Sequence, residues 1–331
     1  MKLLITGASG LLGLNLAVEA ARSHQVVGTD RGRLMSAPFE VLHADLLEPG
    51  AADRMMDQAQ PDAVINCAAI ANVDQCEADP DLARRVNAEV PERIAAACAS
   101  LGTRLIQIST DAVFDGTKPG SYVETDDPAP AGVYAATKCA GESSVLRVNP
   151  GAIVARVNFY GWSLSGQRSL AEFFVNNLSN GKAVDGFTDV VFCPMYVRHL
   201  ADTLVRMLQA NLHGIYHVVG PKRMSKFAFG VAIARTFGFA DNLISPRSVE
   251  QSRLVAPRAH NLDLCIHKLS TDLQQAVPDF FTGLAEFYSE YQQGYPQRIR
   301  SYQHRPAVDG EEVPRPTAPS TTGSNGSRHG Y

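Results

Sequence analysis

The sequence predicts an α/β fold in which a doubly wound parallel sheet is followed by a smaller, mostly helical C-terminal lobe. Short apolar runs typical of strands alternate with helical patterns over the first 158 residues, which favours parallel strands joined by helices. Residues 63–67 form a nearly continuous apolar run, as expected for a strand buried on both faces. The 331 residues, 45% of them hydrophobic, can fill one large α/β domain or two unequal lobes.

The strands and helices are expected in a regular order. Runs of β-branched and other apolar residues predict strands, whereas apolar residues at helical spacing predict helices. The predicted strands are 2–6, 25–30, 40–44, 63–67, 105–109, 152–157 and 214–219. The predicted helices are approximately 11–22, 81–101, 132–148, 170–180 and 198–210.

Changes in pattern and composition divide the chain into three parts. The sheet domain is expected in residues 1–158 and is completed by 189–212, and the second lobe is expected in 159–188 and 213–302. From 303 to 331 large apolar residues nearly vanish, while Pro, Gly, Ser and Thr become frequent. Such a segment cannot bury enough surface to order itself, so a disordered tail is expected there.

Charge and cysteine usage exclude several classes of protein. The net charge of −4 gives no electrostatic footprint for nucleic acid or an anionic membrane. The six cysteines are scattered without a CxxC pair, so we expect free thiols in a reducing compartment and no metal site. The apolar N-terminus resembles a signal peptide, but its regularly spaced glycines argue against one. These features predict a cytoplasmic protein.

A glycine-rich turn joins the first strand to the first helix. Residues 6–13 read TGASGLLG, a GxxGxxG pattern that allows a sharp turn and lets a phosphate approach the backbone amides of a helix N-terminus. Asp30, at the end of the second strand, is placed to bond a ribose hydroxyl. A dinucleotide site is therefore predicted. Asp30 favours NAD whereas Arg31 would admit NADP, so both cofactors stay open. The predicted contacts are Gly7, Ser9, Gly10, Leu11, Leu12, Gly13, Asp30 and Arg31.

A second pattern carries acid–base chemistry. Tyr134 and Lys138 are four residues apart at the start of a predicted helix and share one face of it. An ammonium group near a phenol lowers its pKa, which brings tyrosine closer to the range useful for proton transfer. Thr110 ends the fifth strand, where open α/β sheets bind their ligands, and its hydroxyl can bond a carbonyl oxygen.

At these motifs the chain resembles the extended short-chain dehydrogenases/reductases, in particular the dTDP-4-dehydrorhamnose reductase family. The resemblance covers residues 1–290 and rests on 6–13, VINCAA (64–69), STDAVFDG (109–116), YAATKCAGE (134–142), GIYHVVG (214–220) and NLDLCIHKL (261–269). It implies a Rossmann domain, a substrate-binding second lobe and NAD(P)H-dependent reduction of a nucleotide-linked 4-keto-6-deoxy sugar. By the same resemblance, Thr110 polarises the keto oxygen, Tyr134 donates the proton, and Lys138 tunes Tyr134 and holds the nicotinamide ribose.

The resemblance also assigns residues outside the two motifs. It implies that Asn87 braces the active-site helix and that five further residues contact the cofactor: Asp45, Leu46, Cys67, Ala68 and Ala69. We expect substrate contacts from Asp111, Asn158 and Trp162, with simple packing as the alternative for Trp162. The expected partner is the small-molecule nucleotide sugar, and the protein itself is a candidate homodimer.

Departures from the family pattern leave the exact reaction open. Ala112 stands where the family usually has tyrosine, and His199 stands where many relatives have aspartate. The absence of a second acid at Ala112 also disfavours a 4,6-dehydratase. The alternatives are a nucleotide-sugar epimerase of the same fold and a non-catalytic, cofactor-binding regulatory subunit like the methionine adenosyltransferase beta subunit.

Overall fold

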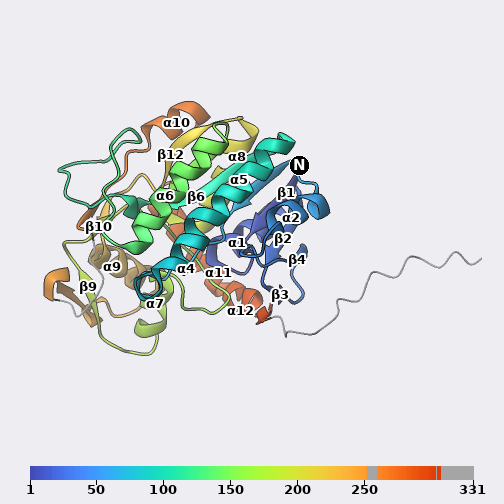
Figure 1. Ribbon diagram of the computed structural model, residues 1–331. Coiled ribbons are helices and arrows are strands. Elements are labelled where there is room, and N and C mark those ends of the chain that lie inside the picture. Colours follow the sequence, from blue (N-terminus) through green and yellow to red (C-terminus); the bar gives the residue numbers. More distant parts are fainter. Residues whose placement is uncertain (252–258, 303, 307–331) are drawn as a thin grey trace, which may run out of the picture.

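A seven-stranded parallel sheet forms the centre of the protein (Figure 1). The computed structural model describes residues 1–251, 259–302 and 304–306. The strand order is β12-β7-β6-β5-β1-β2-β4, and all six pairings are parallel. The strands are β1 (Lys2–Thr6), β2 (Gln25–Asp30), β4 (Glu40–His43), β5 (Ala63–Asn66), β6 (Arg104–Thr110), β7 (Ile153–Val157) and β12 (Gly214–Val218). The predicted doubly wound α/β fold is confirmed.

Helices cover both faces of this sheet. Successive strand residues point to opposite faces, so Leu3 and Ile5 of β1 join one hydrophobic cluster and Leu4 joins the other. The first cluster includes side chains of α1 (Leu11–Ala20) and α8 (Val197–Gln209). The second includes side chains of α2 (Ala51–Ala59), α5 (Val90–Leu101) and α6 (Val133–Val148). Figure 1 shows α5 and α6 lying side by side over the sheet.

The helix predicted over residues 81–101 is interrupted by a π-helical turn. It consists of α4 (Pro80–Arg84), the π-helical segment η1 (Arg85–Glu89) and α5, and α3 (Val73–Ala78) precedes it. Gly141 of α6 packs so closely on η1 that an added Cβ would lie 2.4 Å from the carbonyl oxygen of Asn87. Such π-helical turns are frequent at functional sites. Here the turn presents Asn87 to the start of α6.

Most of the second lobe lies below the sheet domain in the view of Figure 1, whereas its helix α10 lies at the top beside β12. The lobe combines helices with short strands. Its core is aromatic, and the ring of Tyr160 contacts those of Phe229 and Phe287 edge to face. Its helices are α7 (Leu170–Leu178), α9 (Lys226–Phe237), α10 (His267–Leu273), α11 (Phe280–Gln292) and α12 (Tyr295–Arg300). Its strands are β8 (Phe159–Tyr160), β9 (Val184–Phe187), β10 (Val191–Phe192), β11 (Met195–Tyr196), β13 (Met224–Ser225), β14 (Ile244–Arg247) and β15 (Asn261–Leu262).

The structure corrects the predicted division at two places. Residues 214–218, which we assigned to the second lobe, form the edge strand β12 of the main sheet because they pair with β7. Residues 304–306, which we assigned to a disordered tail, form β16 and pair with β3 (Gly32–Leu34). The other tail residues, 303 and 307–331, lie outside the described residues. In the described part of the chain, no helix is long and apolar enough to cross a membrane.

Candidate active site at the carboxyl edge of the sheet

The predicted site residues lie along one edge of the sheet. Because all seven strands run parallel, the segments that follow them emerge at the same edge. From β4 to β7 this edge carries, in spatial order, Asp45, Asp30, Gly7, Cys67, Thr110 and Asn158. The two motifs that are far apart in the sequence are therefore parts of one continuous surface.

The glycine turn leaves room for a ligand at the start of α1. Gly7 has a φ of +63°, which favours glycine, and an added Cβ would lie 3.0 Å from the backbone of Ala68. An added Cβ on Gly13 would lie 2.2 Å from the Gly7 carbonyl oxygen, so the helix sits directly on the turn. The N-cap residue, Gly10, supplies no side-chain hydrogen bond to the first amides of α1. Backbone amides at a helix start without a side-chain cap can bind an anionic group such as a pyrophosphate.

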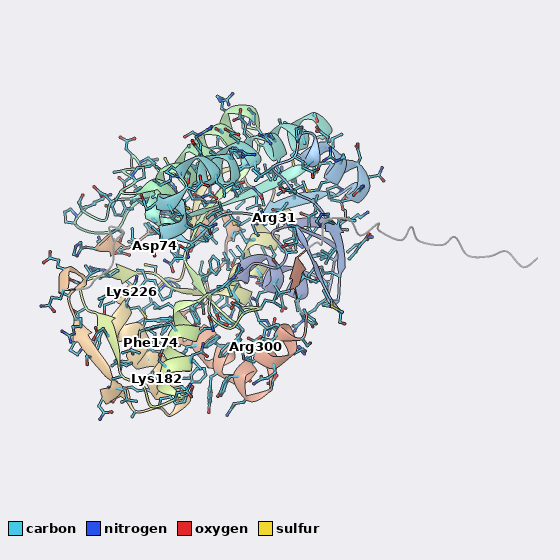
Figure 2. All side chains as sticks on the ribbon, turned by 60° about the horizontal axis from the view of Figure 1, so that its bottom comes forward. Arg31, Asp74, Phe174, Lys182, Lys226 and Arg300 are labelled. Atoms are coloured by element: carbon cyan, nitrogen blue, oxygen red, sulfur yellow. The ribbon has the colours of Figure 1, made fainter. Side chains whose placement is uncertain are left out.

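The residues beside the glycine turn differ in which of their groups can contact a ligand. Leu12 is buried in the core at 5% exposure, so only its backbone can face a ligand. The carboxylate of Asp30 accepts hydrogen bonds from the amides of Ser9 (2.9 Å) and Gly32 (3.2 Å), which ties the glycine turn to the end of β2. Arg31 is exposed on the outer surface and is labelled in Figure 2.

The loop after β5 is held from two sides. The Thr6 hydroxyl donates to Asn66 and accepts from the amide of Ala68 at 3.2 Å. The Asn87 amide bonds both backbone groups of Ile70 and donates to the Thr137 hydroxyl of α6 at 3.2 Å. Asn87 therefore braces the active-site helix as expected, and it also fixes the loop that carries Cys67, Ala68 and Ala69.

The side chain of Lys138 is buried, and its ammonium group contacts the backbone of strand β6. It is 4% exposed, and its Nζ donates to the carbonyl oxygen of Ile108 at 2.5 Å. Burial lowers the pKa of Lys138 to about 8, against the opposing charges of Glu142 and Cys67. Glu142 is itself paired with the buried Arg156 at 2.7 Å. Sequence reasoning missed Glu142, although its position four residues after Lys138 on α6 could have revealed it.

The pKa of Tyr134 moves in the direction opposite to our prediction. We expected Lys138 to lower it, but burial raises it to about 12, with Asp111 adding to the rise and a hydrogen bond to Thr110 opposing it. The physical reason is that the Lys138 ammonium is directed to the Ile108 carbonyl, while the phenol lies beside a carboxylate. Tyr134 thus stays protonated at neutral pH in the protein without ligands.

Thr110, Asp111 and Asn158 form a buried cluster beside Tyr134. The Thr110 hydroxyl lies 3.1 Å from one carboxyl oxygen of Asp111, and the Asn158 amide donates to the other at 2.5 Å. Burial raises the pKa of Asp111 to about 6, although hydrogen bonds and the charge of Lys226 oppose the rise. Lys226 begins α9 in the second lobe, and Figure 2 labels it. The sequence around Lys226 did not indicate that this residue would influence Asp111.

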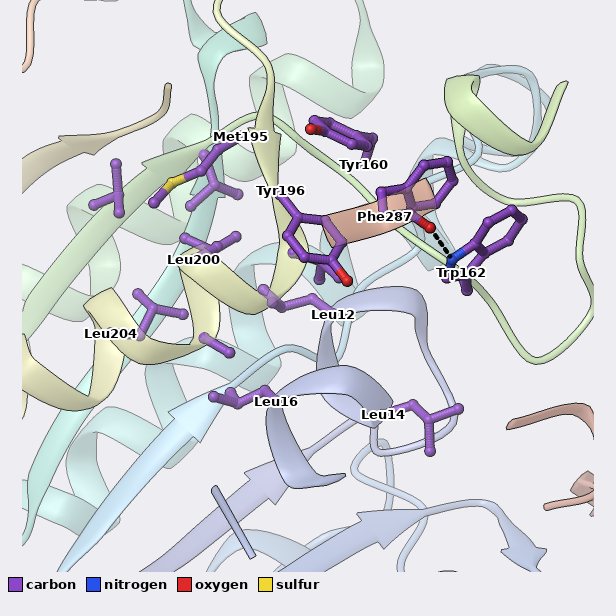
Figure 3. Close-up of a cluster of buried hydrophobic side chains, with 14 of the residues drawn as sticks. Leu12, Leu14, Leu16, Tyr160, Trp162, Met195, Tyr196, Leu200, Leu204 and Phe287 are labelled. Carbon is purple, nitrogen blue, oxygen red and sulfur yellow. Dashed lines mark hydrogen bonds between the residues drawn. The ribbon is translucent and has the colours of Figure 1, made fainter. Parts of the chain in front are cut away.

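Trp162 does not reach the site, so our expectation of a substrate contact is wrong for this residue. Its side chain is 1% exposed and stacks on Phe287 with ring centroids 4.0 Å apart (Figure 3). Its indole N–H donates to the Phe287 carbonyl oxygen at 3.4 Å. Packing, the alternative that we kept open, is the role that the structure gives it.

Comparisons with known proteins agree with this geometry. The family model for the RmlD substrate binding domain matches residues 1–293. The dTDP-4-dehydrorhamnose reductase of Mycobacterium tuberculosis is 36% identical over 78% of this chain and 83% of that protein. The methionine adenosyltransferase 2 subunit beta of Mus musculus is 32% identical over 86% of each chain.

A solved structure extends the similarity to three dimensions. The dTDP-4-dehydrorhamnose reductase of Bacillus anthracis, in complex with NADP, superimposes with a TM-score of 0.78 at 26% identity, over 87% of this chain and 99% of that one. Sheet order, glycine turn and family match all point to the same group. The chain belongs to the RmlD substrate binding domain family of extended short-chain dehydrogenases/reductases.

Proposed function

We propose that the protein reduces a nucleotide-linked 4-keto-6-deoxy sugar to the corresponding hydroxy sugar with NADPH or NADH. The observation that carries the proposal is the convergence of Thr110, Tyr134 and Lys138 at the sheet edge that also holds the glycine turn. The similarity to dTDP-4-dehydrorhamnose reductases supports this choice of substrate.

The residues present fit a nicotinamide dinucleotide. The uncapped start of α1 and the glycines behind it suit the pyrophosphate, and Asp30 with Asp45 and Leu46 suits the adenosine end. Cys67, Ala68 and Ala69 line the path towards Lys138, whose ammonium can bond the nicotinamide ribose. When bound, the reduced cofactor supplies a hydride. Arg31 would favour NADP and Asp30 would favour NAD, so both are candidates.

The side chains of this site can handle the proton and the developing charge. A Tyr134 phenol with a raised pKa is fully protonated at neutral pH and can donate its proton to the keto oxygen. The Thr110 hydroxyl can donate a hydrogen bond to the same oxygen. Lys138, with a pKa of about 8, is mostly charged at pH 7. Its ammonium donates to the Ile108 carbonyl in the protein without ligands, so it would have to turn towards Tyr134 to stabilise the tyrosinate that remains.

The proposal includes the organisation of the whole protein. The sheet domain, residues 1–158 completed by 189–212 and by β12, would bind the cofactor, and the second lobe would hold the nucleotide end of the substrate. Asp111 and Asn158 are proposed to lie next to the reacting carbon. We further propose a cytoplasmic homodimer, for which light scattering measures the mass in solution.

The decisive experiment follows cofactor absorbance with a panel of substrates. Wild-type protein is incubated with NADH or NADPH and with dTDP-, GDP- or UDP-linked 4-keto-6-deoxy sugars. Stoichiometric consumption of the reduced cofactor with one of these sugars supports the reductase. Conversion of a sugar at constant total NADH would favour the epimerase. Cofactor binding without any conversion would favour a regulatory subunit, the class to which the subunit beta relatives belong.

A further inference from the structure

The carboxyl group of Asp111 lies next to the Thr110 hydroxyl. Asp111 is 4% exposed, and one of its oxygens lies 3.1 Å from the Thr110 Oγ1. The Asn158 amide fixes the other oxygen at 2.5 Å, and the backbone amide of Ala112 donates to the Thr110 Oγ1 at 3.2 Å. Both partners of this carboxyl are held by the ends of the adjacent strands β6 and β7. The contact is therefore built into the fold.

A hydroxyl group has one hydrogen to donate and two lone pairs to accept with. An ionised carboxylate can only accept, so it takes the hydrogen of Thr110 and leaves none for a substrate. A neutral carboxyl can instead donate its own hydrogen to the Thr110 oxygen, which already accepts from Ala112. The oxygen then has both lone pairs occupied, and its hydrogen is no longer held by Asp111, so it can turn to the oxygen of the neighbouring Tyr134 or to a substrate oxygen.

We propose that Asp111 is a positioning residue that acts through Thr110, and that its neutral form directs the Thr110 hydrogen to the keto oxygen of the substrate. The inference rests on the proposed reductase function and adds Asp111 as the residue that makes the Thr110 hydrogen available to the substrate. The proton of Asp111 comes from solvent before the ligands bind and is not consumed in the reaction.

The surroundings of Asp111 allow both its neutral and its ionised form near neutral pH. Burial raises its pKa to about 6, and three titratable groups interact with it: Tyr134 from α6, Lys226 from α9 and Cys193 after β10. Lys226 favours the ionised form. The phosphates of a bound cofactor and sugar nucleotide add negative charge, which favours the neutral form. Ligand binding would therefore populate the form that activates Thr110.

The test is the pH profile of kcat for wild-type protein and Asp111→Asn. The Asn amide imitates the neutral acid, because it can donate to Thr110 while its oxygen accepts from Asn158. Wild-type kcat should fall as the pH rises through the pKa of Asp111 in the complex, before a second fall that belongs to Lys138. Asp111→Asn should lose only the first fall and should stay well above Asp111→Ala in kcat at low pH. Asp111→Ala should lower kcat about tenfold at every pH, since the Thr110 hydroxyl is no longer oriented.

Two further variants keep the test decisive. Thr110→Val removes the hydroxyl, so its residual activity should also lack the first fall, even if Asp111→Asn does not fold. Asp115→Asn, a nearby carboxyl that interacts with Thr117 and Tyr122, should keep the wild-type profile. The inference is overturned if Asp111→Asn retains the first fall or is as slow as Asp111→Ala, or if Thr110→Val retains that fall. An active wild-type enzyme with these outcomes overturns this inference alone, whereas a wild type that reduces no sugar overturns the proposed function as well.

Discussion

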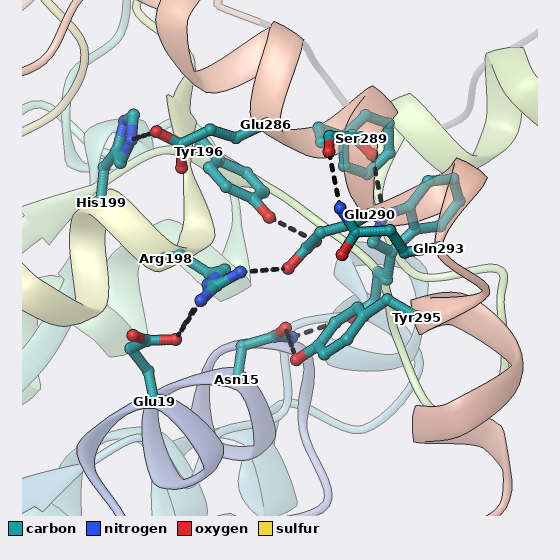
Figure 4. A network of polar contacts seen from close by, with 12 residues as sticks. Asn15, Glu19, Tyr196, Arg198, His199, Glu286, Ser289, Glu290, Gln293 and Tyr295 are labelled. Atoms are coloured by element: carbon teal, nitrogen blue, oxygen red, sulfur yellow. Dashed lines mark hydrogen bonds and ion pairs between the residues drawn. The ribbon is translucent and has the colours of Figure 1, made fainter. Parts of the chain in front are cut away.

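Two polar clusters in this protein stabilise a buried carboxyl group in different ways. Where α1, α8 and α11 meet, Arg198 lies between Glu19 (2.7 Å) and Glu290 (2.6 Å), and the Tyr196 hydroxyl donates to Glu290 (Figure 4). At the sheet edge, Asp111 and Tyr134 lie buried together, and hydrogen bonds rather than a salt bridge hold the carboxyl. We call the first cluster the junction and the second the sheet-edge site.

The difference is visible in the protonation of the two clusters. Burial acts against the charge of Arg198, but Glu290 and Glu19 outweigh it and raise its pKa. Burial also raises the pKa of Glu290, although its interactions with Tyr196 and Arg198 oppose this rise. At the sheet-edge site, burial raises the pKa of both Asp111 and Tyr134 and favours their neutral forms. Paired charges such as those of the junction link two parts of a fold. Groups whose pKa is shifted so that they are neutral near pH 7 are typical of sites of proton transfer. The predictions below test this contrast.

The largest expected effect is on turnover, from Tyr134→Phe. Removing the proton donor should lower kcat by about 10²–10⁴-fold, while cofactor affinity stays unchanged because the phenyl ring remains. Steady-state kinetics and fluorescence titration of NADPH measure the two quantities. Tyr291→Phe, at a partly exposed position of α11, is the control and should behave as wild type. Turnover within tenfold of wild type would show that Tyr134 is not the acid.

Trp162→Ala should act on stability instead of chemistry. The ring is buried and stacked on Phe287, so its loss should cost about 3–5 kcal/mol of unfolding free energy, measured by urea denaturation. KM for the sugar nucleotide should stay unchanged below the melting temperature. Phe281→Ala, with 55% of the residue exposed, should cost less than about 1 kcal/mol. A large rise in KM with normal stability would return Trp162 to the substrate site.

Arg198→Ala tests the junction itself. Glu290 is buried, and without Arg198 its charge lacks compensation, so the unfolding free energy should fall by about 3 kcal/mol. Arg235→Ala breaks the exposed pair with Asp241 and should cost less than about 1 kcal/mol. Equal losses from the two variants would mean that the junction contributes no more than a surface ion pair.

The smallest effect is a pH-dependent gain from Asp111→Asn. The pKa of Asp111 is raised in the folded protein, so the native state binds the proton more tightly. This group therefore lowers stability progressively as the pH rises from about 4 to about 6, and by a constant amount above that range. Relative to wild type, Asp111→Asn should gain roughly 2–3 kcal/mol at pH 7.5 but almost nothing at pH 3. Asp115 has a lowered pKa, so Asp115→Asn should instead lose stability at pH 7.5. Thermal unfolding at the two pH values distinguishes these signs.

Local patterns were enough to predict most of the sheet and part of the site. The glycine turn and the Tyr134–Lys138 spacing are short-range features, because one turn and one helix face fix their geometry. The apolar runs predicted every strand of the main sheet, including residues 214–218. Their assignment to the second lobe failed because strand pairing with β7 is a long-range contact.

What the sequence determined by itself is the fold class and the chemical groups along the sheet edge, since both follow from periodicity and local spacing. The family was identified by the resemblance of its motifs to known proteins. Only the tertiary structure decided how those groups are protonated and which of them reach a ligand. Burial directs the Lys138 ammonium to the Ile108 carbonyl, raises the pKa of Tyr134 and covers Trp162 with Phe287. Desolvation and packing depend on contacts between segments far apart in the chain, so the local spacing of residues does not predict them.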